Sequence, residues 1–167
     1  MRTIWTCLVL LVMSGLAIAQ SGQSRELNKQ ELQQLVPQNY FFAGQTATTQ
    51  LRNAGGVRFA DNHVLILAMV DNSGYSTGIQ QKYQGLLITE VALDVEGKTV
   101  PPGSYGFGTS SETHYDILDI NANEIAGGNV QAADAKGRAV PLRVSLNSDQ
   151  SVTVAMGKRA FVLKRKP

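Results

Sequence analysis

The feature that most constrains the fold of this chain is a period of two in its hydrophobic residues after Pro37. Successive side chains of a β-strand point to opposite faces, so alternating apolar and polar residues predict strands with one buried face. The alternation recurs in five segments, residues 87–95, 114–120, 142–146, 152–156 and 161–163. Short stretches rich in Gly, Asn and Asp separate these segments and predict turns. Because no sustained helical pattern intervenes, the sequence predicts a mostly β fold with antiparallel strands, either a β-barrel or a β-sandwich.

Two further segments complete the predicted architecture. Residues 64–70 form a continuous apolar run that is too short and too β-branched for a helix, which predicts a strand covered on both faces. Residues 24–36 carry leucines at roughly helical spacing, with Ser24 as the expected N-cap and Pro37 as the stop. The sequence therefore predicts a single domain in which one short N-terminal helix packs against the strands.

The N-terminus has the pattern of a bacterial export signal. Arg2 is followed by an apolar stretch over residues 4–12, and Ala17-Ile18-Ala19 offers the small residues that a signal peptidase requires. Cleavage after Ala19 would separate a signal peptide, residues 1–19, from a domain of residues 20–167. The apolar stretch is too short to span a bilayer, so no transmembrane segment is expected after cleavage. A periplasmic or extracellular location follows.

Composition narrows the chemistry of that domain. The only cysteine, Cys7, lies in the predicted signal peptide, which excludes cysteine nucleophiles and cysteine-based metal sites from the mature domain. A domain of about 150 residues can bury a sufficient apolar core without disulfides. The whole chain has a formal net charge of +2, which is too small to favour nucleic acid as a partner.

A candidate ligand site comes from polar residues that interrupt apolar strands. Polar side chains recur along residues 45–52, and charged residues flanked by apolar neighbours are rarely buried unless they are paired. If a barrel or sandwich encloses a pocket, we expect it to be lined by Arg52, Arg58, Tyr83, Glu90 and Tyr105. They would orient a small polar or amphipathic ligand. In a packed interior, the same residues would form a surface salt-bridge network.

Catalysis has one candidate constellation. His114 and Asp116 are two residues apart on a predicted strand, so they share a face and could touch. A small hydrolase or isomerase could use His114 with Asp116 or Glu90 as acid–base groups. The predicted all-β pattern lacks the strand–turn–helix context that the G-x-S-x-G elbow of many hydrolases needs, and the sequence favours a protein without catalytic activity.

Neither a metal nor a cofactor is predicted. The two histidines, His63 and His114, have no second histidine or cysteine at ligand spacing. Residues 119–123 begin like a calcium loop, but Glu124 and Val130 stand where such a loop needs Gly and Glu. We therefore expect a polar turn between two strands.

The C-terminus is basic, with Lys or Arg at positions 158, 159 and 164–166. Lysines often protect an exposed strand from edge-to-edge pairing, so this segment predicts a final edge strand. The alternative is a tail that contacts anionic lipid head groups or cell-wall polymers.

Residues 96–106 contain Gly-Lys-Thr-Val-Pro-Pro-Gly-Ser-Tyr-Gly, which resembles a G-K-x-(Leu/Val)-P-x-G-x-Y-G hairpin of small exported bacterial proteins. The chain as a whole resembles an uncharacterised family of acidobacterial type. That resemblance implies a β-sandwich or barrel of the bacterial envelope and carries no activity. The functional prediction is an exported, non-catalytic binding or envelope-associated module that meets a small ligand or an envelope protein. A structural protein that pairs through a sheet edge is the remaining alternative.

Overall fold

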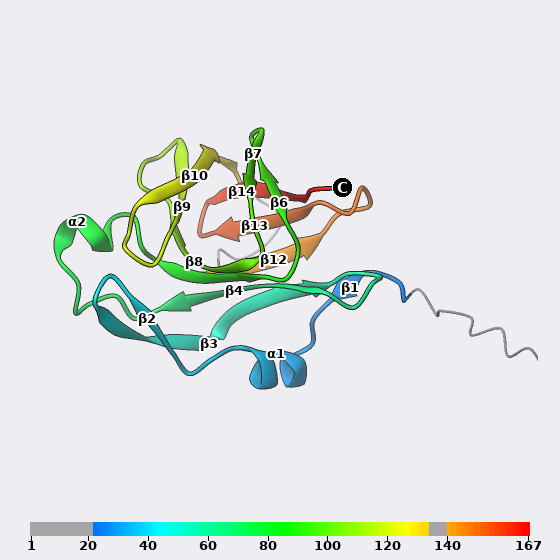
Figure 1. Cartoon of the computed structure of the whole chain (residues 1–167), viewed down its shortest axis with the longest axis horizontal. Coiled ribbons are helices and arrows are strands. Elements are labelled where there is room, and N and C mark those ends of the chain that lie inside the picture. The colour runs from blue at the N-terminus through cyan, green and yellow to red at the C-terminus, as the bar shows by residue number, and fades with distance from the viewer. Residues whose placement is uncertain (1–21, 134–139) are drawn as a thin grey trace, which may run out of the picture.

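The computed structural model describes residues 22–133 and 140–167, and it is a sandwich of two antiparallel sheets (Figure 1). The predicted signal peptide, residues 1–19, lies outside the described residues. No helix among the described residues has the length and apolar character needed to cross a membrane.

The larger sheet has eight strands. Its order is β1 (Arg25–Glu26), β3 (Gln45–Arg58), β4 (Val64–Val70), β5 (Gly85–Thr89), β8 (Gly103–Gly108), β9 (His114–Leu118) and β10 (Glu124–Asn129), with β2 (Asn39–Phe42) paired to β3. The smaller sheet has six strands. Its order is β12 (Arg143–Leu146), β13 (Val152–Met156), β14 (Arg159–Arg165), β6 (Leu93–Val95) and β7 (Lys98–Val100), with β11 (Gln131–Ala132) paired to β14. The predicted mostly β, antiparallel fold is confirmed, and the sheets form a sandwich rather than a closed barrel.

The core between the sheets is built from apolar and aromatic side chains. The Tyr115 ring stacks on Phe161 at 4.0 Å between centroids, and Phe107 meets Phe161 edge-on at 6.3 Å. β4 is covered on both faces, as its apolar run predicts, because Leu65 and Leu67 enter this core while Ile66 packs on the other side of the sheet. A second cluster on that outer side is centred on Phe42, Tyr75 and Tyr83.

The N-terminal helix is present but begins later than predicted. α1 (Lys29–Leu35) is capped by Asn28, whose side chain accepts from the backbone N–H groups of Gln30 and Glu31. The Glu31 carboxylate in turn accepts a hydrogen bond from Asn28 N, which completes a capping box. Ser24 is not the cap, because its hydroxyl accepts from Ala60 N before β1. The helix ends before Pro37 and covers the outer face of the larger sheet (Figure 1). A second helix, α2 (Thr77–Gln80), is a single turn.

The predicted strand over residues 87–95 is wrong in one respect, because it is two strands in different sheets. β5 ends at Thr89 and β6 begins at Leu93. Between them the Thr89 hydroxyl donates to Val91 O at 2.6 Å, and this local hydrogen bond turns the chain from one sheet to the other. The alternation of apolar residues continues through the crossover, so periodicity could not reveal the break.

The C-terminal strand is not the predicted edge strand. β14 pairs with β13 on one side. On its other side it pairs with two earlier segments of the chain, β6 and β11. Three basic residues of this segment contact other parts of the protein. Arg165 pairs with Asp61 at 2.6 Å, Arg159 pairs with Glu112, and Lys166 donates to the Thr99 hydroxyl.

Candidate functional site

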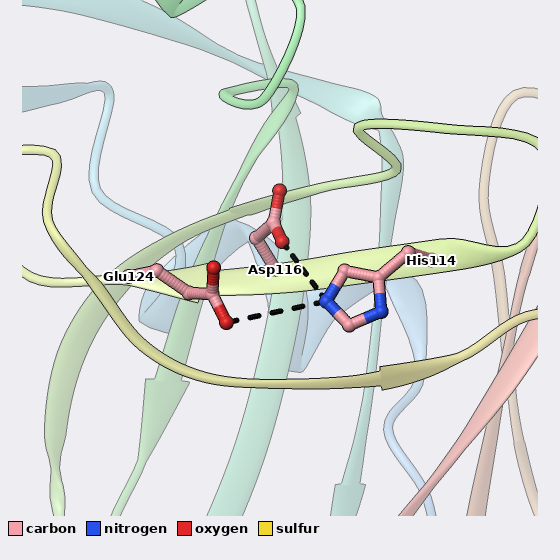
Figure 2. Close-up of side chains that lie close together, drawn as sticks. All are labelled: His114, Asp116 and Glu124. Carbon is pink, nitrogen blue, oxygen red and sulfur yellow. Dashed lines mark ion pairs between the residues drawn. The ribbon is translucent and has the colours of Figure 1, made fainter.

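Three potential metal ligands converge on the outer face of the β9–β10 hairpin (Figure 2). His114 Nε2 lies 3.3 Å from Asp116 Oδ1 and 4.0 Å from Glu124 Oε1. All three donor atoms lie within 4.8 Å of one another. Figure 2 shows both carboxylates directed at the same imidazole nitrogen. His114 and Asp116 lie on β9, and Glu124 lies on β10.

The turn that joins the two strands brings Glu124 back beside β9. Asp119 holds this turn by accepting from Asn121 N and Asn123 N, both at 2.9 Å, and from the Asn123 side chain at 3.0 Å. Ala122 adopts a positive φ of 64° inside it. The predicted polar turn is thus confirmed, and its role is to place β10 antiparallel to β9.

A β-bulge then decides which way Glu124 points. Glu124 is paired with Leu118, but Ala126 is paired with Ile117, so Ile125 is an extra residue in β10. Directly paired residues share a face of a sheet, and Gly127, three residues after Glu124, is paired with Asp116 on the same face. In a regular strand without the bulge, alternation from Gly127 would turn Glu124 into the core. Bulges often re-aim a side chain in this way next to functional sites.

Gly127 leaves the space that the three side chains share. A Cβ atom at Gly127 would lie 2.7 Å from His114 Nε2 and 3.1 Å from Glu124 Oε1. Both distances are shorter than ordinary contacts, so a larger residue would push the donors apart. The same Cβ would also lie 2.7 Å from the backbone oxygen of Tyr115, so the pairing with β9 and the cluster both require glycine here.

The cluster combines a buried acid with two accessible groups. The Asp116 side chain is 6% exposed, whereas His114 and Glu124 are 41% and 50% exposed. Carboxylates are rarely buried without a partner. Among the described residues, His114 is the one cationic or titratable nitrogen within ion-pair distance of Asp116. Its 3.3 Å contact is long for an N–H···O bond, and the two acids concentrate negative potential at this point.

Such a donor set can hold a divalent cation or exchange a proton. Imidazole nitrogen and carboxylate oxygen are ligands of zinc and of other first-row transition metals. The contact between His114 and Asp116 that the sequence suggested is found. Glu124 was missed, because only the turn and the bulge bring it there. Glu90, the alternative acid, lies elsewhere and accepts from Val64 N at 2.9 Å.

The residues predicted to line a pocket are not gathered around one. Arg58 pairs with Glu31 at 3.4 Å beside α1, and Arg52 is exposed on β3. Tyr105 donates to Pro101 O at 2.8 Å. Tyr83 is fully buried on the outer side of the sheet, stacked on Phe42 at 3.9 Å, and burial raises the pKa of its hydroxyl. They lie at separate places because β3 carries Arg52 and Arg58, β8 carries Tyr105, and Tyr83 and Glu90 lie outside the strands, before and after β5.

One hollow in the described part of the molecule lies at one end of the sandwich and has a volume of about 720 Å³. It is lined by Gln84, Thr109, Glu112, Val130, Gln131, Ala132, Pro141, Met156, Lys158 and Arg159. Arg159 spans this end, donating to the Thr109 hydroxyl at 3.0 Å and to Ser111 O at 3.2 Å. Its guanidinium therefore links β14 to the loop after β8. None of the five residues predicted to line a pocket lines this hollow.

Comparisons with family models, with curated proteins and with solved structures gave no match to this chain, so the geometry of the hairpin cluster carries the functional argument.

Proposed function

We propose that this protein is an exported, non-catalytic binding module that holds a divalent transition-metal ion on the outer face of its β9–β10 hairpin. His114 Nε2 and one carboxylate oxygen each from Asp116 and Glu124 are the protein ligands. One observation carries the proposal: three donor atoms of the right chemistry converge within 4.8 Å around a buried carboxylate.

The distances support an ion at this point. Nitrogen and carboxylate ligands lie about 2.0–2.2 Å from a zinc ion, which places tetrahedral donors about 3.4 Å apart. The separations from His114 Nε2 are 3.3 Å and 4.0 Å. The Glu124 side chain is half exposed, so its rotation can shorten the 4.0 Å separation from His114 Nε2. Gly127 has no side chain and leaves room for this movement. A cation would also compensate the charge of buried Asp116.

The ligand chemistry favours a transition metal over calcium or magnesium. Calcium and magnesium prefer sites made only of oxygen, and calcium takes six to eight such ligands. An imidazole nitrogen beside two carboxylates suits zinc, manganese, iron, cobalt or nickel. Export, if it occurs as the N-terminal pattern predicts, would place this site in the periplasm or outside the cell. The small polar ligand or envelope partner expected from the sequence would meet the protein at this hairpin.

The experiment is a calorimetric titration of Zn²⁺ into purified, chelator-treated protein that carries no affinity tag. We expect one ion per chain in the wild type and no saturable binding in His114→Gln. His63→Gln is the matched control, because His63 Nδ1 lies 3.1 Å from Asp61 but the described structure places no third ligand beside that pair. Absence of binding in the wild type, or equal losses in the two variants, would refute the proposal.

Acid–base catalysis by the His114–Asp116 pair is a second candidate, favoured by their 3.3 Å contact. It predicts turnover of activated esters that a chelator leaves unchanged and that Asp116→Asn lowers. Turnover abolished by the chelator would point to the ion instead, and no turnover in any condition would remove this candidate.

A further inference from the structure

The three protein ligands approach the proposed ion from one side. Asp116 lies beneath it in the sheet, and His114 and Glu124 flank it with 41% and 50% of their side chains exposed. The group of candidate ligands among the described residues contains these three and no fourth. Four ligands is the minimum that zinc takes in proteins, so at least one coordination position faces solvent.

The neighbouring residues that could supply a fourth ligand are already engaged. Asn129 is paired with His114 across the hairpin, but both its backbone N–H, at 2.7 Å, and its side-chain amide, at 3.1 Å, donate to the Glu96 carboxylate. Asp119 accepts three hydrogen bonds within its turn. Recruiting either residue would break contacts that shape the hairpin. The described residues thus offer no further ligand, and we assign the open position to a donor from outside the chain.

Charge then selects the kind of donor. Two carboxylates neutralise a divalent ion, and a neutral imidazole adds nothing, so the loaded site would not repel an anion. A nearby ammonium group adds positive charge, because Lys82 Nζ donates to Ala122 O at 2.8 Å in the turn next to Glu124. The backbone of Lys82 also lies against β8 at Gly108, which is paired with Asp116.

We infer that the loaded site captures an oxyanion, a carboxylate or phosphate group of a ligand, whose oxygen replaces water at the open position while Lys82 attracts its charge. This inference rests on the proposed function, since the anion is held through the ion. It names the chemical class of the ligand that this module would bind.

The test uses Co²⁺ in place of Zn²⁺, because the visible absorption of Co²⁺ reports on its ligands. Purified protein loaded with one equivalent of Co²⁺ is titrated at constant ionic strength with inorganic phosphate and, separately, with acetate. We expect a saturable spectral change with at least one anion, and the stronger response tells phosphate from carboxylate. In Lys82→Gln, which keeps a donor for Ala122 O, the affinity should fall about two- to fivefold.

The outcomes separate the two proposals. Co²⁺ that binds with a spectrum unmoved by either anion would overturn this inference and leave metal binding intact. Failure of Co²⁺ and Zn²⁺ to bind at all would overturn both. Equal anion affinities in wild type and Lys82→Gln would remove the lysine from the site. His114→Gln, expected to bind no Co²⁺, is the control for anion effects on free Co²⁺.

Discussion

The two faces of strand β9 show how one strand can serve two purposes. On the inner face Tyr115 and Ile117 enter the core between the sheets, and the Tyr115 ring stacks on Phe161. On the outer face His114 and Asp116 meet Glu124. Two adjacent glycines of β10 make room for both arrangements. A Cβ at Gly128 would lie 2.9 Å from the Tyr115 ring, and one at Gly127 would lie 2.7 Å from His114 Nε2.

The difference between the faces lies in what each requires. The inner face needs apolar groups of suitable volume, because burial of apolar surface has no directional demand. The outer face buries a carboxylate, which has to be matched by specific groups in specific positions. We therefore expect substitutions on the inner face to change stability and substitutions on the outer face to change ligand binding.

The largest effect should come from the inner face. Tyr115→Ala removes a ring that is 2% exposed, and loss of a buried aromatic side chain costs about 3–5 kcal/mol of unfolding free energy. Urea unfolding in the presence of a chelator measures this loss. Below the unfolding transition, the Zn²⁺ affinity of the variant should stay close to that of the wild type. A stable variant that fails to bind Zn²⁺ would break the separation between the faces.

The next effect concerns the outer face. Wild-type protein should gain about 2.7 kcal/mol of unfolding free energy when free Zn²⁺ is one hundred times its dissociation constant. Asp116→Asn should gain almost nothing, since it loses an anionic ligand. In chelator, the same variant should be at least as stable as wild type, because one of two neighbouring carboxylate charges is gone. Thermal unfolding with and without Zn²⁺ measures both quantities, and an equal gain in wild type and variant would contradict the assignment of Asp116.

The paired glycines give a matched test of smaller size. Gly127→Ala and Gly128→Ala each place a Cβ within 2.7 Å of another atom, and such overpacking costs about 1–3 kcal/mol. Both variants should lose stability to a similar degree. Only Gly127→Ala should also lose Zn²⁺ affinity, by at least about tenfold, because its methyl group enters the cluster. Equal affinities in the two variants would show that the ion does not sit over Gly127.

The smallest effect concerns Glu31 on α1, away from both faces of β9. It tests whether a change outside the hairpin leaves metal binding unaltered. Hydrogen bonds from Arg25 and from Asn28 N lower the pKa of Glu31 from 4.5 to about 2. A lowered folded-state pKa contributes stability above pH 4.5, and that contribution is lost as the pH falls towards 2. Glu31→Gln should therefore lower the melting temperature slightly at pH 7 but not near pH 2, with Zn²⁺ affinity unchanged at pH 7. A deficit that is the same at both pH values would assign the effect to packing.

The sequence predicted the class of fold and the layout of single strands, because alternation reports directly on burial. It also predicted that His114 and Asp116 share a face. It could not predict Glu124 as their neighbour, since that depends on the bulge at Ile125, where no residue type marks an extra position. The crossover after Thr89 was hidden for a similar reason, because alternation runs through it. The position of β14 inside its sheet depends on long-range pairing with β6 and β11, which local patterns do not encode.

The most direct test of the central claim is anomalous diffraction at the zinc edge from crystals of the Zn²⁺-loaded protein. We predict one strong peak within about 2.3 Å of His114 Nε2 and of carboxylate oxygens of Asp116 and Glu124. A crystal of the loaded protein with no anomalous peak at the β9–β10 hairpin, or with its peak beside His63 and Asp61 instead, would contradict the account.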